Sequence, residues 1–226
     1  ALKMNGDYGK AKQAFEKFRK DVKGSDWSDM RKWAEIEAEG CELAMAIQKN
    51  PEDVKITHFE APCNSAYSDI APYWINDSTM LFASLPTDSV IIASEKTDRF
   101  IKLYEASFSN DKPAAPTSYS GLTVEGKHIA NPSLSPDGKE LFYTICEEDA
   151  KNPNQIICHI YSSKKSGEGW SEGEKLSDVI NVSGYNSTHP HMSDQDGRTI
   201  LYFSSDRPGG KGGRDIWYSQ RNSSGE

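Results

Sequence analysis

The spacing of apolar and polar positions changes once along the chain. In residues 8–18 and again in 27–38, apolar side chains recur every three or four positions, which is typical of amphipathic helices. Gly24-Ser25-Asp26 separates the two runs, and Pro51 follows the second, where proline ends a helix because it cannot continue the hydrogen-bond ladder. The pattern therefore predicts a helical hairpin within residues 5–49.

Beyond this hairpin the apolar runs become short and are divided by Gly, Pro, Asn, Asp and Ser. Runs of this kind are typical of strands joined by tight turns. In the first stretch they predict strands near residues 71–75, 79–84, 89–94 and 99–106. We therefore expect a helical segment over 1–52 and a β domain over 53–226.

The β domain repeats one pattern three times. Each copy has a proline, a turn aspartate and an apolar pair in the same order: Pro72, Asp77 and Leu81-Phe82; Pro132, Asp137 and Leu141-Phe142; Pro190, Asp196 and Ile200-Leu201. The prolines are 60 and 58 residues apart, and a second marker, Tyr104, Tyr161 and Tyr218, recurs every 57 residues. A unit of this length with several strands is typical of a propeller blade.

Turn chemistry supports the repeat. Asp137-Gly138 and Asp196-Gly197 supply the positive-φ positions of a tight hairpin, and Asn76-Asp77 is a less regular copy. Three blades cannot close a propeller, which generally takes four to eight. We therefore expect an incomplete propeller whose open edge is covered by further blades, by a partner or by self-association with a second copy.

Charge and cysteine content narrow the classes of function. With 26 basic and 34 acidic residues the net charge is −8, which disfavours nucleic acid as a partner. The four cysteines show no CxxC spacing and so no zinc signature. Cys146 and Cys158 lie on two successive predicted strands, which leaves open a disulfide across a hairpin or two buried free thiols. No apolar run is long enough to cross a bilayer.

Candidate binding residues lie in three loops predicted at the blade rim. They are Asn64, Ser65, Asp69, His189, His191, Asp206, Arg207, Arg214 and Asp215. His189 and His191 have metal-ligand spacing but no third ligand nearby, so we interpret them as loop residues and predict no metal. Asp206 and Arg207 face Arg214 and Asp215 across a glycine-rich loop, where they either bridge its base or present two arginines to a carboxylate or glycan.

No catalytic or cofactor motif stands out. The chain has no Gly-x-Ser-x-Gly elbow, and its glycine-rich loop lacks the Gly-Lys-Ser/Thr ending of a phosphate-binding loop. We therefore predict no cofactor and no enzymatic activity.

Several motifs resemble known families. Gly6-Asp7-Tyr8 with Ala11 and Phe15 resembles a tetratricopeptide helix, and the segments 131–139 and 189–198 resemble the TolB-type propeller repeat. The segment 202–217, like Asn64-Ser65 with Ser68-Asp69 and Pro72, resembles Bacteroidetes periplasmic proteins that join tetratricopeptide repeats, a propeller and an OmpA-like peptidoglycan-binding domain, including a type IX secretion component.

The resemblance implies a mainly β fold with N-terminal helices, namely a tetratricopeptide-like hairpin followed by about three blades of an incomplete propeller. It implies a non-catalytic periplasmic scaffold, associated with the outer membrane, whose partners are proteins of the envelope or secretion machinery. Peptidoglycan would be reached through a domain of the parent protein that lies outside this sequence. The alternative is a propeller that binds peptidoglycan, a glycan or a peptide.

Overall fold

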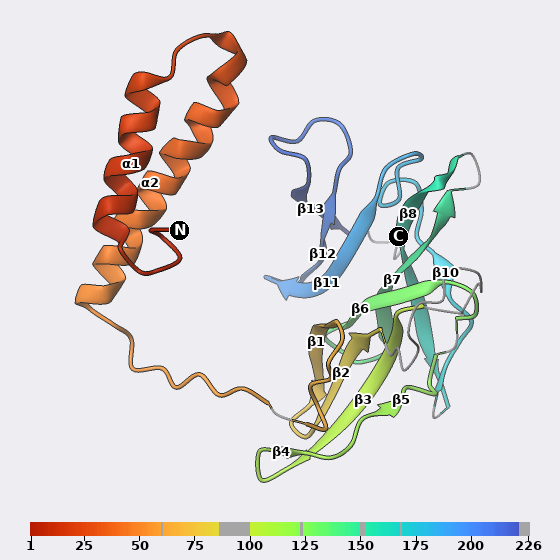
Figure 1. Ribbon diagram of the computed structural model, residues 1–226. Coiled ribbons are helices and arrows are strands. Elements are labelled where there is room, and N and C mark those ends of the chain that lie inside the picture. The colour runs from red at the N-terminus through yellow and green to blue at the C-terminus, as the bar shows by residue number, and fades with distance from the viewer. Residues whose placement is uncertain (60, 86–99, 123, 150–151, 168, 222–226) are drawn as a thin grey trace, which may run out of the picture. The chain divides into compact units, whose positions relative to one another are not determined.

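The chain is mainly β, with two N-terminal helices followed by three antiparallel sheets (Figure 1). The structure, a computed structural model, describes all residues except 60, 86–99, 123, 150–151, 168 and 222–226. This coarse fold class is the one that the sequence predicted. Contacts divide the chain into units Ala1–His58 and Phe59–Glu226, so the boundary lies six residues beyond the expected one.

The first unit is a helical hairpin. Helices α1 (Tyr8–Asp21) and α2 (Ser28–Lys49) are joined through a short 3-10 turn, η1 (Ser25–Trp27). Small side chains fill the interface, where Ala11 of α1 and Ala34, Ala38 and Cys41 of α2 are buried. Ion pairs also join the helices, such as Lys12 with Glu42 at 2.9 Å. Neither helix has the length and apolar character needed to cross a bilayer.

The second unit consists of three sheets in chain order, each starting with a simple up-and-down run of strands. The first sheet contains β1 (Asp69–Asn76), β2 (Thr79–Ser84), β3 (Lys102–Ser109), β4 (Lys112–Pro113) and β5 (Thr117–Ser118). The second contains β6 (His128–Leu134), β7 (Glu140–Asp149), β8 (Asn152–Ser166), β9 (Gly169–Trp170) and β10 (Glu174–Lys175). The third contains β11 (Ser187–Gln195), β12 (Arg198–Ser205) and β13 (Asp215–Gln220).

The strand predicted near residues 89–94 lies outside the described residues. The strand predicted at 99–106 corresponds to β3, which begins and ends about three residues later. Strands β1 and β2 match their predicted positions closely because the turn at Asn76–Ser78 fixes them. Asn76 accepts a hydrogen bond from the Ser78 backbone at 2.9 Å, a local bond that favours the turn.

The repeated proline marks a β-bulge in the first strand of every sheet. The residue before it, Ala71, Asn131 or His189, has a positive φ of 53°, 55° or 55°. The pairing register shifts at the same three places. A bulge adds one residue to one strand of a pair and bends it, and a non-glycine residue at positive φ is uncommon. The three sheets therefore share a bulge at the same place. The repeated prolines predicted that these places are equivalent, but not that each is a bulge.

The second repeat marker is only partly equivalent in space. Tyr104 pairs with Phe82 and Tyr161 pairs with Tyr143, but the residue that pairs with Phe203 at the matching place is Trp217. Tyr218 is one position later. Because strand side chains alternate between faces, the prediction that Tyr218 continues the series is wrong, and Tyr218 lies on the opposite face of its sheet.

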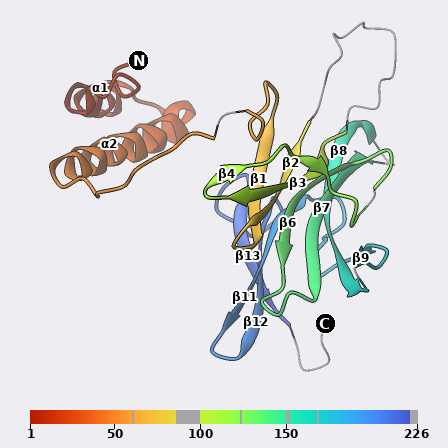
Figure 2. The same cartoon turned by 90° about the horizontal axis from the view of Figure 1, so that it is seen from below.

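The sheets pack on one another in sequence order. β6 contacts strands of the first sheet, and β11 contacts β6, β7 and β8 of the second (Figure 2). One buried cluster joins the first and second sheets through Leu103 and Tyr143, and another joins the second and third through Ile160 and Phe203. The second sheet thus uses one of its faces to pack on the sheet that follows it and its other face to pack on the sheet that precedes it.

Candidate functional site

The outer face of the first sheet carries a pocket of about 230 Å³. This volume lies below the range of about 300–1,000 Å³ typical of sites for drug-sized ligands, so the pocket suits a small ligand or one ring of a larger one. It is formed by the segment before β1, by strands β1, β2 and β3, and by the segment between β4 and β5. The lining residues are Pro62, Cys63, Ser65, Tyr67, Asp69, Phe82, Ser84, Tyr104 and Pro116.

Asp69 supplies the charge in this pocket. Its carboxylate accepts hydrogen bonds from the Ser65 backbone at 2.7 Å and from the Ser65 hydroxyl at 2.8 Å. Burial alone would raise the pKa of Asp69, but the hydrogen bonds from Ser84 and Ser65 outweigh it and lower the pKa below its usual value. The carboxylate is therefore ionised at neutral pH and fixed in position by the segment that precedes β1.

Aromatic rings form the walls beside this carboxylate. Phe82 and Tyr104 lie in a tilted arrangement with centroids 6.0 Å apart, and Tyr67 has 46% of its surface exposed. The Cys63 thiol is buried, and this burial, followed by the Asp69 charge, raises its pKa. It therefore stays protonated and is a poor nucleophile. The pocket combines apolar ring faces with one fixed anionic acceptor.

Two of the three residues predicted in this loop thus line the pocket. Ser65 and Asp69 do so, whereas the Asn64 side-chain amide donates to the Phe59 carbonyl and holds the loop closed. The sequence motif identified the loop but missed Tyr67, Phe82 and Tyr104. In the sequence Tyr104 stands out only as a repeat marker. The three aromatic rings come from separate segments, so the order of residues along the chain does not show that they lie around one carboxylate.

His189 and His191 lie on either side of the third bulge. The His189 backbone donates to the Thr144 hydroxyl at 3.2 Å, and its imidazole lies 2.9 Å from the Thr188 hydroxyl. Burial, followed by the positive charge of Arg214, lowers the pKa of His189, so the ring is neutral at pH 7. The bulge also interrupts the regular alternation of side chains along the strand, which two histidines at this spacing would need in order to lie on one face.

Arg207 is directed into the protein. Its guanidinium donates to the carbonyls of Val179, at 2.8 Å, and Ile180. It also lies over the rings of Phe203 and Trp217, at 4.8 and 5.3 Å from their centroids. Its donors are therefore engaged in joining the third sheet to the segment before it, which explains the motif without a ligand.

The two aspartates of the same motif shape backbone. Asp206 accepts from the backbone and side-chain amides of Asn186 at 2.6 and 2.7 Å. Asp215 accepts from the backbones of Lys211 and Gly212 at 2.9 and 3.1 Å. These hydrogen bonds fix two loops. In the part of the chain that the structure describes they do not join the aspartates to Arg207 and Arg214, which was one of the two arrangements that the sequence left open.

Cys146 and Cys158 face each other across β7 and β8 and form a disulfide. Cys41 and Cys63 are free and buried. Of the two alternatives that spacing left open, the structure has the bridged one.

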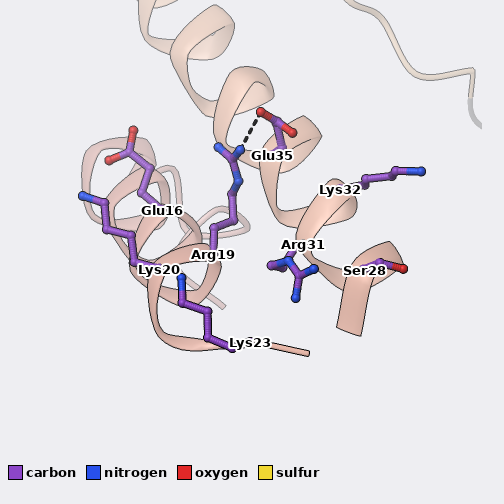
Figure 3. A pocket seen from close by; sticks show the side chains of 8 residues that line it. All are labelled: Glu16, Arg19, Lys20, Lys23, Ser28, Arg31, Lys32 and Glu35. Carbon is purple, nitrogen blue, oxygen red and sulfur yellow. Dashed lines mark hydrogen bonds and ion pairs between the residues drawn. The ribbon is translucent and has the colours of Figure 1, made fainter. Parts of the chain in front are cut away.

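A basic groove of about 650 Å³ lies in the helical unit (Figure 3). Its lining residues are Glu16, Arg19, Lys20, Lys23, Ser28, Arg31, Lys32 and Glu35. Arg19 crosses the groove to Glu35 at 2.6 Å, and Arg31 donates to the Gly24 carbonyl at 2.8 Å. The lining residues recur at three- and four-residue steps in both helical segments. The sequence therefore held a sign of this groove, which the sequence analysis missed. Its lining side chains are not buried, so the groove is an ordinary solvated basic surface.

Comparison with known proteins gives distant likenesses only. No family model and no curated protein matches the chain. Among solved structures, an endo-arabinase from Bacteroides thetaiotaomicron is 18% identical with a TM-score of 0.47, and the match covers 74% of this chain and 61% of that one. A thermostable family-43 glycoside hydrolase is 14% identical with a TM-score of 0.40, over 72% and 57%. An endo-1,5-alpha-L-arabinanase from Thermotoga petrophila is 12% identical with a TM-score of 0.38, over 69% and 40%.

These findings correct several expectations. The predicted membership of the tetratricopeptide, propeller and OmpA-like family is wrong: no family model matches the chain, and the similar structures reported above are an arabinase and a glycoside hydrolase. The predicted non-catalytic role in type IX secretion and the prediction of no enzymatic activity are not borne out either: the structures that the chain resembles are named as an endo-arabinase, a family-43 glycoside hydrolase and an endo-1,5-alpha-L-arabinanase. The motifs misled because they specify bulges and turns, and local geometry does not imply function.

The chain spans about three fifths of the length of the first structures that it matches. At this similarity the comparison does not transfer an activity to the chain. The case for any function therefore depends on the pocket itself.

Proposed function

We propose that the β domain binds a glycan in the pocket on the outer face of the first sheet. The observation that carries the proposal is the ionised carboxylate of Asp69, held by Ser65 and Ser84 beside the rings of Tyr67 and Tyr104. Binding sites typically combine apolar and aromatic walls with a few placed polar groups that fix orientation. Sugars match such a lining because they have both apolar C–H faces and hydroxyl groups.

Asp69 suits the role of hydrogen-bond acceptor for sugar hydroxyls. Hydrogen bonds to an ionised carboxylate are stronger than those between neutral groups. Glycoside hydrolysis generally uses two carboxyl groups, one of which acts as an acid with a raised pKa. Asp69 is the one carboxyl among the pocket residues that the structure describes, and its pKa is lowered. The pocket as described supports binding, and turnover is a separate readout of the same experiment.

The test is a titration of the 226-residue chain with neutral pentose and hexose oligosaccharides and with soluble peptidoglycan fragments. Binding is followed by NMR and calorimetry, and released reducing ends are measured in parallel. We expect Asp69→Asn and Tyr67→Ala each to weaken binding at least about tenfold. Asp77→Asn, which removes the same charge from the β1–β2 turn, is the matched control and should bind as the wild type does.

Binding that persists in both pocket variants, or that is lost equally in Asp77→Asn, would contradict the proposal. Unfolding curves of each variant confirm that a loss of binding does not reflect a loss of structure.

We further propose that the three sheets are blades of an incomplete propeller. Their common strand order, their repeated first-strand bulges and their sequential face-to-face packing support this arrangement. A crystal structure in which β1, β6 and β11 do not surround a common axis would contradict it. The tetratricopeptide character of the helices stays a prediction. Tetratricopeptide repeats stack on neighbouring repeats, and α2 has an exposed apolar stripe of the kind that such stacking covers, formed by Trp33, Ile36, Leu43 and Ile47.

We also propose an oxidising compartment, in agreement with the predicted periplasmic location. The Cys146–Cys158 disulfide supports it, because such bonds are rare in reducing compartments. Protein isolated from its native cells and unfolded without reductant should expose two reactive thiols rather than four. Four reactive thiols would contradict the proposal.

A further inference from the structure

Asp69 carries a negative charge that no described cation neutralises. Its hydrogen-bond partners are uncharged, namely the backbone and hydroxyl of Ser65, at 2.7 and 2.8 Å, and the hydroxyl of Ser84. None of the ion pairs between described residues includes Asp69. The described lining of the pocket contains no lysine, arginine or histidine. The pocket as described therefore has a net negative charge that a cationic ligand would neutralise.

This carboxylate is partly withdrawn from water. Asp69 is partly buried, and Ser84 beside it is buried. Burial raises the pKa of Asp69, but the hydrogen bonds from Ser84 and Ser65 keep the pKa below its usual value. The group therefore stays charged in a place where water screens its charge incompletely. A charge in such a place attracts an opposite charge more strongly than one on the open surface does.

The aromatic rings of the pocket favour the same sign of ligand charge. Phe82 and Tyr104 lie with their ring centroids 6.0 Å apart, and Tyr67 lines the same pocket with 46% of its surface exposed. The face of an aromatic ring is the negative part of its quadrupole, so it attracts a cation placed over it and repels an anion. The carboxylate and the rings therefore act together on a cationic ligand, and both oppose an anionic one.

Two features decide which cation fits. A metal ion in a protein usually takes several ligands, and the described residues include no group of three or more His, Cys, Asp or Glu side chains that could hold one. The pocket volume of about 230 Å³ gives room for one sugar ring. In a 2-amino sugar the ammonium group lies next to a ring hydroxyl, so both groups can donate to one carboxylate while the apolar ring face lies against an aromatic side chain.

We propose that the pocket binds an amino sugar with a free ammonium group, in preference to neutral, N-acetylated or acidic sugars. The ammonium group donates to the Asp69 carboxylate and lies beside the rings of Tyr67 and Tyr104. This inference rests on the proposed glycan-binding function and adds to it the charge of the sugar that is bound. An N-acetyl group removes the cation, and a uronic acid places a second negative charge next to the carboxylate, which is unfavourable.

The test compares three β-1,4-linked trisaccharides that differ only in the group at C2, which is a hydroxyl in cellotriose, an N-acetyl group in tri-N-acetylchitotriose and an ammonium group in chitotriose. Each is titrated into the 226-residue chain at about pH 5.5, where the amine is protonated and Asp69 is ionised, and binding is followed by NMR and calorimetry. We expect chitotriose to bind about tenfold more tightly than the other two, as expected when a charged donor replaces an uncharged one. The preference should shrink as the salt concentration rises from about 20 to 300 mM.

Variants connect the preference to Asp69. Asp69→Asn keeps the shape of the side chain and removes its charge, so it should lose the preference for chitotriose. Tyr67→Phe keeps the ring face and should retain the preference. Asp77→Asn, which removes the same charge from the β1–β2 turn, is the matched control and should also retain it.

Equal affinity of the wild type for the three trisaccharides, lost in Asp69→Asn, would overturn this inference and leave the glycan site standing. A preference for chitotriose that survives in Asp69→Asn would also overturn it, because the cation would then bind elsewhere on a chain of net charge −8. Nα-acetyl-lysine amide bound as tightly as chitotriose would show that any ammonium group suffices, and would overturn the preference for a sugar. If the chain binds no oligosaccharide at all, this inference and the proposed function both fail.

Discussion

Truncation of Arg207 tests whether the most conspicuous charged motif of the third sheet is structural. The guanidinium donates to the carbonyls of Val179 and Ile180 and lies over Phe203 and Trp217. A hydrogen bond to a charged group contributes about 1.5–3 kcal/mol, and a cation–π contact contributes roughly 0.5–1 kcal/mol at exposed sites. Water can replace the bond to the exposed Val179 carbonyl, so we take the lower end of these ranges. Arg207→Ala should then cost about 3 kcal/mol of unfolding free energy.

The loss should be visible by thermal denaturation. For a domain of this size, 1 kcal/mol lowers Tm by about 2–4 °C, so Arg207→Ala should lower it by roughly 6–12 °C. Arg207→Lys keeps the charge but not the planar fork and should fall between the wild type and Arg207→Ala. Arg198→Ala, at an exposed arginine of β12, is the control and should change Tm little.

A Tm for Arg207→Ala within about 1 °C of the wild type would refute this reasoning. If the same variant lost glycan binding while keeping its stability, Arg207 would belong to a binding site after all.

Three further predictions concern other parts of the β domain. Cys146→Ser, which removes a disulfide that closes a separation of 12 residues, should lower stability by about 2 kcal/mol in unfolding without reductant; an unchanged Tm would contradict the bridge. Gly173→Ala would place its Cβ 2.0 Å from the Tyr143 hydroxyl, whereas Gly169→Ala meets open space; the first should cost about 1–3 kcal/mol and the second little, and equal costs would refute the packing. The pKa of Asp69 is lowered in the folded chain, so its ionised form contributes stability above its usual pKa near 3.8, and this stability is lost as the pH falls through the folded pKa. The difference in unfolding free energy between the wild type and Asp69→Asn should therefore shrink below about pH 4. A difference that stays constant with pH would contradict the lowered pKa.

Periodicity and turn residues were enough to predict the coarse fold. The step from helical spacing to short apolar runs separated the two units. Asp196-Gly197 has the two predicted positive-φ residues, with φ values of 51° and 73°, whereas in the second copy Gly138 has a positive φ of 68° and Asp137 does not. These features are local, so the chain pattern contains them. The repeated prolines likewise mark equivalent places, because each lies at a bulge.

The sequence did not reveal how residues from different segments meet. Tyr218 continues the 57-residue spacing, yet Trp217 occupies the equivalent position, because the register of the third sheet differs by one residue from the spacing. Arg207 follows a motif typical of a surface loop, but the rings of Phe203 and Trp217 hold it inward. The function could not be predicted from the sequence, because the resemblance to periplasmic propeller proteins depended on residues that determine bulges and turns.

The candidate site was half predictable. Ser65 and Asp69 were identified because their motif opens the first unit, whereas Tyr67 and Tyr104 join them only through the packing of the segment before β1 on the sheet. The exposed Ile216 illustrates the same limit. The sequence shows that Ile216 is apolar, but only the structure shows that it is exposed while Leu103 and Ile160, at the equivalent positions of β3 and β8, are buried.

The most direct test of the proposed glycan site is a crystal structure of the chain with the oligosaccharide that binds it best in solution. Our account predicts a sugar ring against Tyr67 or Tyr104, with at least one hydroxyl donating to the Asp69 carboxylate. A sugar bound elsewhere on the β domain or in the helical groove, with the Asp69 pocket free of it, would contradict the account.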